Sequence, residues 1–181
     1  MNEHIPENLD DAASVDAATH YEISSFLSNE AALLDAGHYT GWMSLLTEDI
    51  QYRMPISVTV ARGDAGAEPL GGMAHFDEDY YSLGKRVARL EGDHAWTEDP
   101  PSRTRRFITN QRGFFGSTED EYLAYSYLLV FRSRLDVRPP EWVSAQRRDV
   151  LRRVGTSLRL ARRYITIDES VLRTQNLAIF L

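Results

Sequence analysis

The chain has 181 residues, 43% of them hydrophobic and 26% charged, and it contains no cysteine. This length and composition are those of one globular domain with a sizeable core. Without cysteine, disulfides, thiolate nucleophiles, cysteine-ligated metals and a Rieske cluster in this chain are excluded. No apolar run reaches the roughly 18 residues of a membrane helix, and the start is acidic rather than a secretory signal, so we expect a cytoplasmic protein without membrane contact.

The formal net charge of -7 is unevenly distributed along the chain. Residues 1–100 carry 19 acids and 5 bases, whereas residues 101–181 carry 8 acids and 15 bases. Of the 20 basic residues 19 are arginine, and seven of these lie between residues 147 and 168. A nucleic-acid groove normally mixes lysine with arginine on a basic domain, whereas arginine alone suits bidentate pairing with carboxylates. The pattern therefore predicts carboxylate pairing, and we expect no nucleic-acid partner.

Residues 1–15 are predicted to form a flexible arm, and residues 16–181 a single domain. Apolar residues then recur at a spacing of three to four, at Ile23, Phe26, Leu27, Ala31 and Leu34. This spacing predicts a helix that begins at Asp16 or Thr19, both suitable N-caps, and ends at Gly37.

Four further segments follow before residue 95. A short second helix is expected to carry Trp42, Leu45 and Leu46. The alternation in residues 49–55 predicts a strand that ends at Pro55, and the glycine-rich residues 63–72 predict a loop. Residues 75–92 predict a third helix, with acids in its first turn and bases in its last, as the helix dipole favours.

Beyond residue 95 the hydrophobic period changes to two. Four long strands are predicted, at residues 105–115, 121–135, 141–154 and 157–167, with turn residues between them. Residues 176–181 are interpreted as a further edge segment. Helices followed by consecutive strands indicate an α+β fold, in which the helices pack on one face of a curved, mainly antiparallel sheet.

Strict alternation along residues 157–167 places arginine on both faces of the last strand. One face carries Leu158, Leu160, Arg162, Tyr164 and Thr166, and the other carries Arg159, Ala161, Arg163, Ile165 and Ile167. Because a buried arginine without a carboxylate or carbonyl partner is costly, at least one arginine is expected to have a partner on a covered surface.

The sequence offers candidate residues for a metal site and for an acid–base catalytic site. His75 precedes Asp77 and Asp79, but these acids are interpreted as capping and dipole residues of a helix rather than metal ligands. Acid–base catalysis would need a carboxyl group in an apolar pocket, and three aspartates lie on or beside strands: Asp49, Asp149 and Asp168. Three tyrosines are candidate oxyanion donors: Tyr52, Tyr125 and Tyr164. The favoured interpretation gives Asp149 and Asp168 to neighbouring arginines and the tyrosines to the core.

Four blocks of sequence, in this order and spacing, carry a family resemblance: FLSNEAALLDAGHYTGWMSLLTEDIQYRMP, HFDEDYYSLGKRV, WTEDPPSRTRRFITN and QRRDVLRRVGTSLRLARRYITIDESVLRTQNLAIFL. Together they resemble the small (beta) subunit of bacterial aromatic-ring-hydroxylating dioxygenases. The resemblance extends from about residue 22 to Leu181, and its general form is similar to the biphenyl, toluene and polycyclic-hydrocarbon branch.

The resemblance implies a nuclear-transport-factor-like (cystatin-like) cone, the fold of ketosteroid isomerase and scytalone dehydratase. It also implies a large (alpha) partner subunit that holds a Rieske [2Fe-2S] cluster and a mononuclear Fe(II), while this chain holds no catalytic residue, cofactor or metal. Three small subunits are expected to form a trimer within a three-alpha, three-beta assembly. The alternatives are a stand-alone isomerase or dehydratase, or a small-ligand-binding module, that uses the cavity of the cone.

The assembly gives the arginines a role, because arginine is enriched and lysine depleted at protein interfaces. Some of the acids in residues 1–100 are expected to supply the carboxylates. Ion-pair networks within the cone and across subunit contacts are predicted for eight residues: Arg103, Arg105, Arg106, Arg147, Arg148, Arg152, Arg162 and Arg163.

Overall fold

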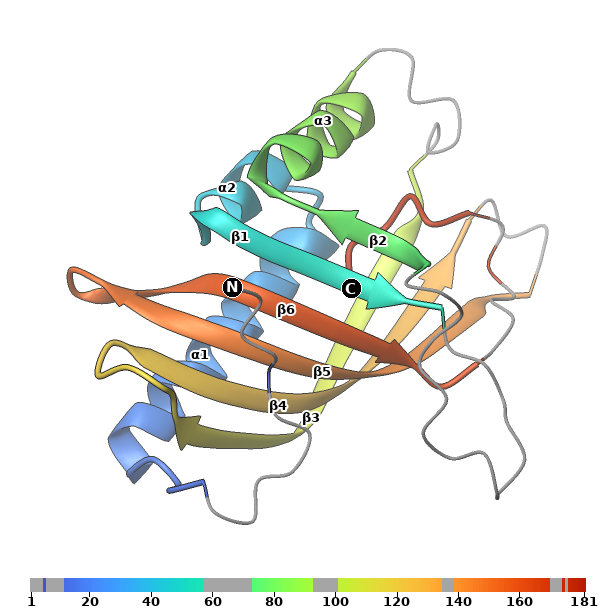
Figure 1. Cartoon of the computed structure of the whole chain (residues 1–181). Coiled ribbons are helices and arrows are strands. Elements are labelled where there is room, and N and C mark those ends of the chain that lie inside the picture. Colours follow the sequence, from blue (N-terminus) through green and yellow to red (C-terminus); the bar gives the residue numbers. More distant parts are fainter. Residues whose placement is uncertain are drawn as a thin grey trace.

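The computed structural model describes residues 5, 12–56, 73–92, 101–134, 139–169, 174 and 176–181. Within these residues three helices and six strands form one α+β unit (Figure 1). The predicted arm is described only at Ile5, which is buried, and at residues 12–15, where the Val15 backbone N–H donates to the Gly113 carbonyl. The predicted loop at 63–72 lies outside the described residues.

Helix α1 spans Ala17–Asp35 and confirms the first predicted helix. The carboxylate of the N-cap Asp16 accepts a hydrogen bond of 2.7 Å from the Thr19 backbone N–H. After the helix, Gly37 adopts a φ of 70°, a left-handed conformation that favours glycine. The buried stripe of α1 is Ile23, Phe26, Leu27, Glu30, Ala31 and Leu34.

The second predicted helix is shorter than expected. Helix α2 spans Tyr39–Met43, and Leu46, which was expected in this helix, instead opens strand β1 at Leu46–Pro55. The alternation that predicted the strand is real, because Ile50, Tyr52 and Met54 are buried. Leu45 and Leu46 were assigned to a helix because they lie where α2 ends and β1 begins, so their apolar side chains fit either element.

The third predicted helix begins five residues later than expected. Residues Ala74–Glu78 form strand β2, antiparallel to β1, and helix α3 spans Tyr80–Glu91. Phe76 is buried while Asp77 is exposed, so this segment follows a period of two. Asp79 is the N-cap of α3, where its carboxylate and the Ser82 side chain form a reciprocal capping box. No acid lies in the first turn itself.

The four long strands are confirmed as β3 (Arg103–Phe115), β4 (Glu121–Ser133), β5 (Glu141–Val154) and β6 (Ser157–Ile167). The sheet order is β2-β1-β6-β5-β4-β3, in which β1 and β6 are parallel and the other neighbouring pairs are antiparallel. Helix α1 crosses one face of the curved sheet, and α2 and α3 lie at its β1–β2 end (Figure 1). The concave face and α1 enclose the main core.

Strict alternation along β6 is interrupted by a bulge. The β5–β6 register shifts between Val150 and Leu151, which pair with Arg162 and Leu160, so Ala161 is the extra residue. Leu158 and Leu160 consequently belong to the same core as Ile165 and Ile167, although the sequence pattern placed these pairs on opposite faces.

Residues 176–181 form neither a strand nor a helix, contrary to the predicted edge segment. They enter the interior instead, where Ile179, Phe180 and Leu181 are 5%, 2% and 0% exposed. We call residues 176–181 the inner segment. Among the described residues no helix has the length and apolar character needed to cross a membrane.

Candidate functional site

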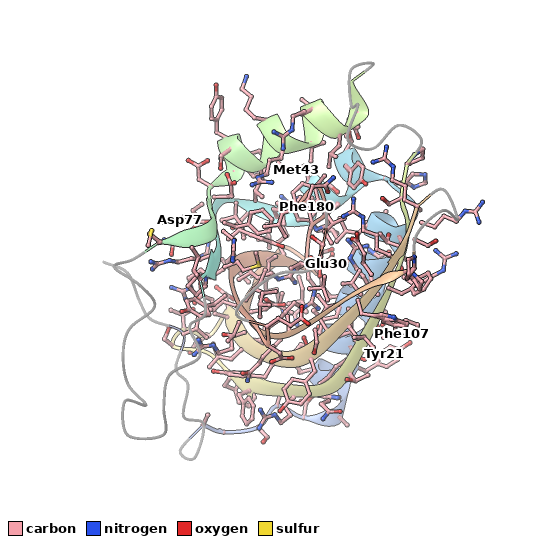
Figure 2. All side chains as sticks on the ribbon, turned by 90° about the vertical axis from the view of Figure 1, so that its right-hand side faces the viewer. Tyr21, Glu30, Met43, Asp77, Phe107 and Phe180 are labelled. Atoms are coloured by element: carbon pink, nitrogen blue, oxygen red, sulfur yellow. The ribbon has the colours of Figure 1, made fainter. Side chains whose placement is uncertain are left out.

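Four charged side chains meet inside the cone, and we call them the ionic quartet: Glu30, Arg147, Asp149 and Arg163. Glu30 comes from the buried stripe of α1, Arg147 and Asp149 from β5, and Arg163 from β6. All four are at most 1% exposed. Figure 2 shows Glu30 in the middle of the molecule, at the face of α1 that points to the sheet.

Arg163 is the centre of the quartet. Its Nη1 and Nη2 donate to the two oxygens of Glu30 at 2.7 and 2.8 Å. Its Nε and Nη2 donate to the two oxygens of Asp149 at 2.8 Å each. The guanidinium thus forms two bidentate ion pairs, the arrangement in which arginine and carboxylate bind most strongly. The bulge at Ala161 is what turns Arg163 to the concave face, beside Leu160 and Ile165.

Arg147 is held less completely than Arg163. Its Nη1 lies 3.3 Å from Glu30 Oε2 and its Nε 3.4 Å from Ser126 Oγ. Its Nη2 has no hydrogen-bond partner within the described part of the chain. Burial, with the nearby Arg163 charge, lowers the pKa of Arg147, whereas Asp149 and Glu30 help raise the pKa of the equally buried Arg163 well above its ordinary value.

The electrostatics of Glu30 follow from its neighbours. Burial alone would raise the pKa of this carboxyl group, but Arg163 and Arg147 outweigh burial and lower the pKa to about 2. The Trp42 indole N–H adds a hydrogen bond of 3.1 Å to Glu30. The carboxylate is therefore ionised at neutral pH and saturated with donors, which makes it a poor general acid or base.

The inner segment completes this centre. The Tyr52 hydroxyl donates to the Leu181 carbonyl at 2.6 Å and accepts from the Leu181 N–H at 2.8 Å. Arg163 Nη1 also reaches the Leu181 carbonyl, at 3.0 Å. The Phe180 ring stacks on Trp42 with the centroids 4.3 Å apart. Burial raises the pKa of Tyr52, so its hydroxyl keeps its proton.

Three of the predicted arginines form ion pairs outside the quartet, and their side chains range from buried in Arg106 to partly exposed in Arg152 and Arg162. Arg106 Nη1 binds Asp35 at the end of α1, and its Nη2 donates to the Phe180 carbonyl at 2.6 Å. Arg152 and Arg162 share Glu121, each at 2.9 Å, and Arg152 also binds Asp49 at 2.8 Å. The Arg106 pair joins α1 to β3. The two pairs of Glu121 join the start of β4 to β5 and β6.

The eight predicted arginines therefore do not form a single surface. Arg147 and Arg163 lie in the interior, where their guanidiniums are enclosed by this chain, so their ion pairs are of the kind expected within the cone. Arg148 is 4% exposed, lies 4.4 Å from the Tyr164 ring centroid and donates to the Ile5 carbonyl. Arg103 and Arg105 are exposed on β3. An interfacial role for the surface members stays a prediction.

The histidine and aspartates once considered for metal binding do not converge. Asp79 caps α3, and Asp77 is exposed on β2. In the described part of the chain, no group of three His, Cys, Asp or Glu residues has the arrangement of a metal site. A Rieske cluster also needs cysteine, which the sequence lacks, so this chain cannot ligate one.

The candidate acid–base residues have structural partners. Asp149 is paired with Arg163, as predicted, whereas the partner of Asp168 among the described residues is Ser144 Oγ, which donates to it. Tyr52 and Tyr125 are buried, as expected for core residues. A cavity of about 620 Å³ lies beside β1, β2, β6 and the start of α3, and its lining includes Arg53, Asp77, Tyr164 and Arg163 of the quartet.

Sequence reasoning missed Glu30, the carboxylate that joins α1 to two arginines. A signal was present, because Glu30 follows Phe26 and Leu27 by four and three residues and so falls on the apolar stripe of the helix. An acid at that position, in a chain with arginine-rich strands, predicts a buried ion pair.

An aromatic surface lies on the outer face of β3, β4 and β5, and we call it the outer patch: Phe107, Leu129, Phe131 and Trp142. Phe107 pairs with Leu129 and Phe131 with Trp142 across neighbouring strands, so the four share one face. Phe107 and Trp142 are each 50% exposed and Leu129 is 39% exposed. A contiguous apolar patch of this kind is typical of a protein interface.

Solved structures share this fold. One chain of naphthalene 1,2-dioxygenase with indole bound in the active site is similar with a TM-score of 0.83 and 27% identity, over 92% of this chain and 88% of that one. A scytalone dehydratase-like structure from Novosphingobium aromaticivorans, at 15% identity and a TM-score of 0.60 over 84% and 85% of the two chains, shows the fold alone. The predicted nuclear-transport-factor-like α+β cone is confirmed.

The sequence comparisons define the family more narrowly. Residues 29–174 match the family model described as ring hydroxylating beta subunit. The biphenyl 2,3-dioxygenase subunit beta of Rhodococcus jostii is 37% identical, and the benzene 1,2-dioxygenase subunit beta of Pseudomonas putida is 35% identical. Each alignment covers 93% of this chain and 91% of the relative. The chain belongs to the ring-hydroxylating dioxygenase beta subunit family, as the resemblance predicted.

Proposed function

We propose that this chain is the non-catalytic, structural beta subunit of a multicomponent Rieske non-haem iron dioxygenase that dihydroxylates aromatic rings in cytoplasmic hydrocarbon catabolism. The observation that carries the proposal is the filled interior of the cone. The acids of the ionic quartet are tied to arginines, and the inner segment packs against Trp42 and Tyr52.

The filled interior argues against a stand-alone isomerase or dehydratase. Such an enzyme needs an acid or base with a pKa near the working pH and room for a substrate beside it. Glu30 has a pKa of about 2, and Asp149 is held by two short hydrogen bonds to Arg163. We propose that the redox chemistry belongs to a large alpha partner subunit that holds both iron groups, and the lack of cysteine in this chain supports this division.

The outer patch supports self-association, and we propose that it contacts a second copy of this chain. Arg103 and Arg105 are exposed on β3, and Arg105 lies directly opposite Phe131. Residues 1–100 carry 19 acids against 5 bases, so a neighbouring copy offers the complementary charge. A cyclic trimer of such contacts would present one end of each cone to the large subunits.

Co-expression with a tagged large subunit tests the subunit role. We expect both chains to co-purify, iron to be present in the complex, and this chain alone to bind no iron and to turn over no aromatic substrate. Tight iron binding or turnover by the isolated chain would overturn the proposal.

A separate variant tests the outer patch. Trp142→Glu places a charge in the patch, and we expect the mass of the isolated chain, measured by light scattering, to fall from trimer to monomer. Tyr21→Glu is the matched control, because Tyr21 is 74% exposed on α1 and outside the patch. An unchanged mass for Trp142→Glu, or an equal effect of both variants, would contradict the assignment.

A further inference from the structure

The inner segment is held as a bound ligand would be. Residues 176–181 lie in no helix or strand, and side chains of the cone bind the backbone of Phe180 and Leu181. Arg106 Nη2 donates to the Phe180 carbonyl, and Tyr52 and Arg163 both donate to the Leu181 carbonyl. In Figure 2, Phe180 lies within the molecule beside the region of Glu30.

The same site has a slot for an aromatic ring. The Phe180 ring stacks on Trp42 at an interplanar angle of 28°, and the Tyr39 ring packs edge-on against it with the ring centroids 5.9 Å apart. Trp42 is fully buried, and the Met54 and Phe76 side chains belong to the same core. An apolar interior with a few convergent polar groups is the ordinary composition of a small-molecule site.

The polar groups of the site prefer an oxygen with partial or full negative charge. Tyr52 and Arg163 are each 1% exposed, and their donors converge on one carbonyl oxygen at 2.6 and 3.0 Å. Without the inner segment the Tyr52 hydroxyl would lose both of its hydrogen bonds to Leu181, and Arg106 Nη2 its bond to Phe180. Buried donors left unpaired are costly, so the vacated site favours a ligand that restores these bonds.

We propose that the cone contains a binding site for small aryl carboxylates, formed by Trp42, Tyr52, Arg106 and Arg163, which residues 176–181 of the same chain occupy. The aromatic ring takes the place of the Phe180 side chain, and one carboxylate oxygen takes the place of the Leu181 carbonyl oxygen, between Tyr52 and Arg163. The inner segment thus acts as an intramolecular ligand and blocks the site while it is bound there. This inference does not depend on the subunit role proposed above.

Binding of phenylacetate tests the proposal, with the chain in complex with its large subunit. Calorimetry on the complex with the full chain measures any sites outside the cone. We expect deletion of residues 176–181 to add one site per copy of this chain. Tyr52→Phe, introduced into the shortened chain, should weaken this added site about tenfold, because one hydrogen bond to a charged oxygen is lost. Toluene, which lacks the carboxylate, should bind there more weakly than phenylacetate.

Two results would overturn the proposal. One is a shortened chain that keeps its circular-dichroism spectrum yet adds no phenylacetate site. The other is an added site whose affinity Tyr52→Phe leaves unchanged. If the shortened chain does not fold, Phe180→Gly in the full-length chain replaces it, since this variant empties only the ring slot. Toluene should then raise the unfolding temperature of Phe180→Gly and not that of the unaltered chain, and equal shifts in both would refute the slot.

Discussion

Replacement of Glu30 by glutamine isolates the contribution of the ionic quartet. The variant keeps the shape of the side chain and removes the charge that faces Arg147 and Arg163. Glu30 accepts four hydrogen bonds, two from Arg163 and one each from Arg147 and Trp42, and its side chain is 1% exposed. Glutamine offers one acceptor oxygen and turns an amide N–H₂ toward a guanidinium.

The loss of stability expected for Glu30→Gln can be estimated in two ways. Removal of one partner from a buried ion pair typically costs about 3–5 kcal/mol. Independently, the fall of the Glu30 pKa from its ordinary value of 4.5 to about 2 corresponds to about 3 kcal/mol of preference for the charged form. We therefore expect Glu30→Gln to lower the free energy of unfolding by about 3–5 kcal/mol.

Urea unfolding at one fixed protein concentration measures this loss, because assembly would otherwise change the apparent stability. Glu22→Gln is the matched control on the same helix. Glu22 binds Arg153 at 2.6 Å, but its side chain is 48% exposed, so its loss should cost about 0–1 kcal/mol. If Glu30→Gln costs no more than Glu22→Gln, the quartet is not a source of stability and the reasoning is wrong.

Three further predictions concern stability. Because the folded-state pKa of Glu30 lies below 4.5, the stability that its carboxylate gives to the fold is complete above pH 4.5 and is lost as the pH falls toward 2. Acid titration followed by circular dichroism should show this loss of stability, and Glu30→Gln should lack it. Arg163→Met should cost more in urea unfolding than Arg147→Met, because only the former leaves two carboxylates without their bidentate partner; equal costs would contradict this order. Gly116→Ala should reduce the free energy of unfolding by about 1–3 kcal/mol and so lower the thermal midpoint, because the added Cβ would lie 2.6 Å from a backbone oxygen. An unchanged midpoint would refute the contact.

Much of the fold follows from local patterns in the sequence. The α1 stripe, the Asp16 cap and Gly37 define the first helix, and the four period-two segments become β3 to β6. Errors occur where one element meets the next, as at Leu46 and at Ala74–Glu78. There a single apolar side chain fits either period, and pairing with β1 decides the outcome.

The interior site was less predictable for a different reason. Arginine-rich strands predict buried ion pairs, but strict alternation does not show which arginine faces inward. The bulge at Ala161 reverses the alternation and directs Arg163 into the cone, and a bulge of this kind has no strong local signal. The destination of residues 176–181 is likewise a tertiary outcome, because their backbone is bound by side chains from distant segments.

The separation of the quartet along the chain has a consequence for biosynthesis. Glu30 and Arg163 are 133 residues apart, so the helix leaves the ribosome long before its cationic partner exists. Until β6 is made, Glu30 and Asp149 both lack Arg163, the arginine that joins them. The quartet therefore cannot be completed before β6 has been synthesised, however early α1 forms.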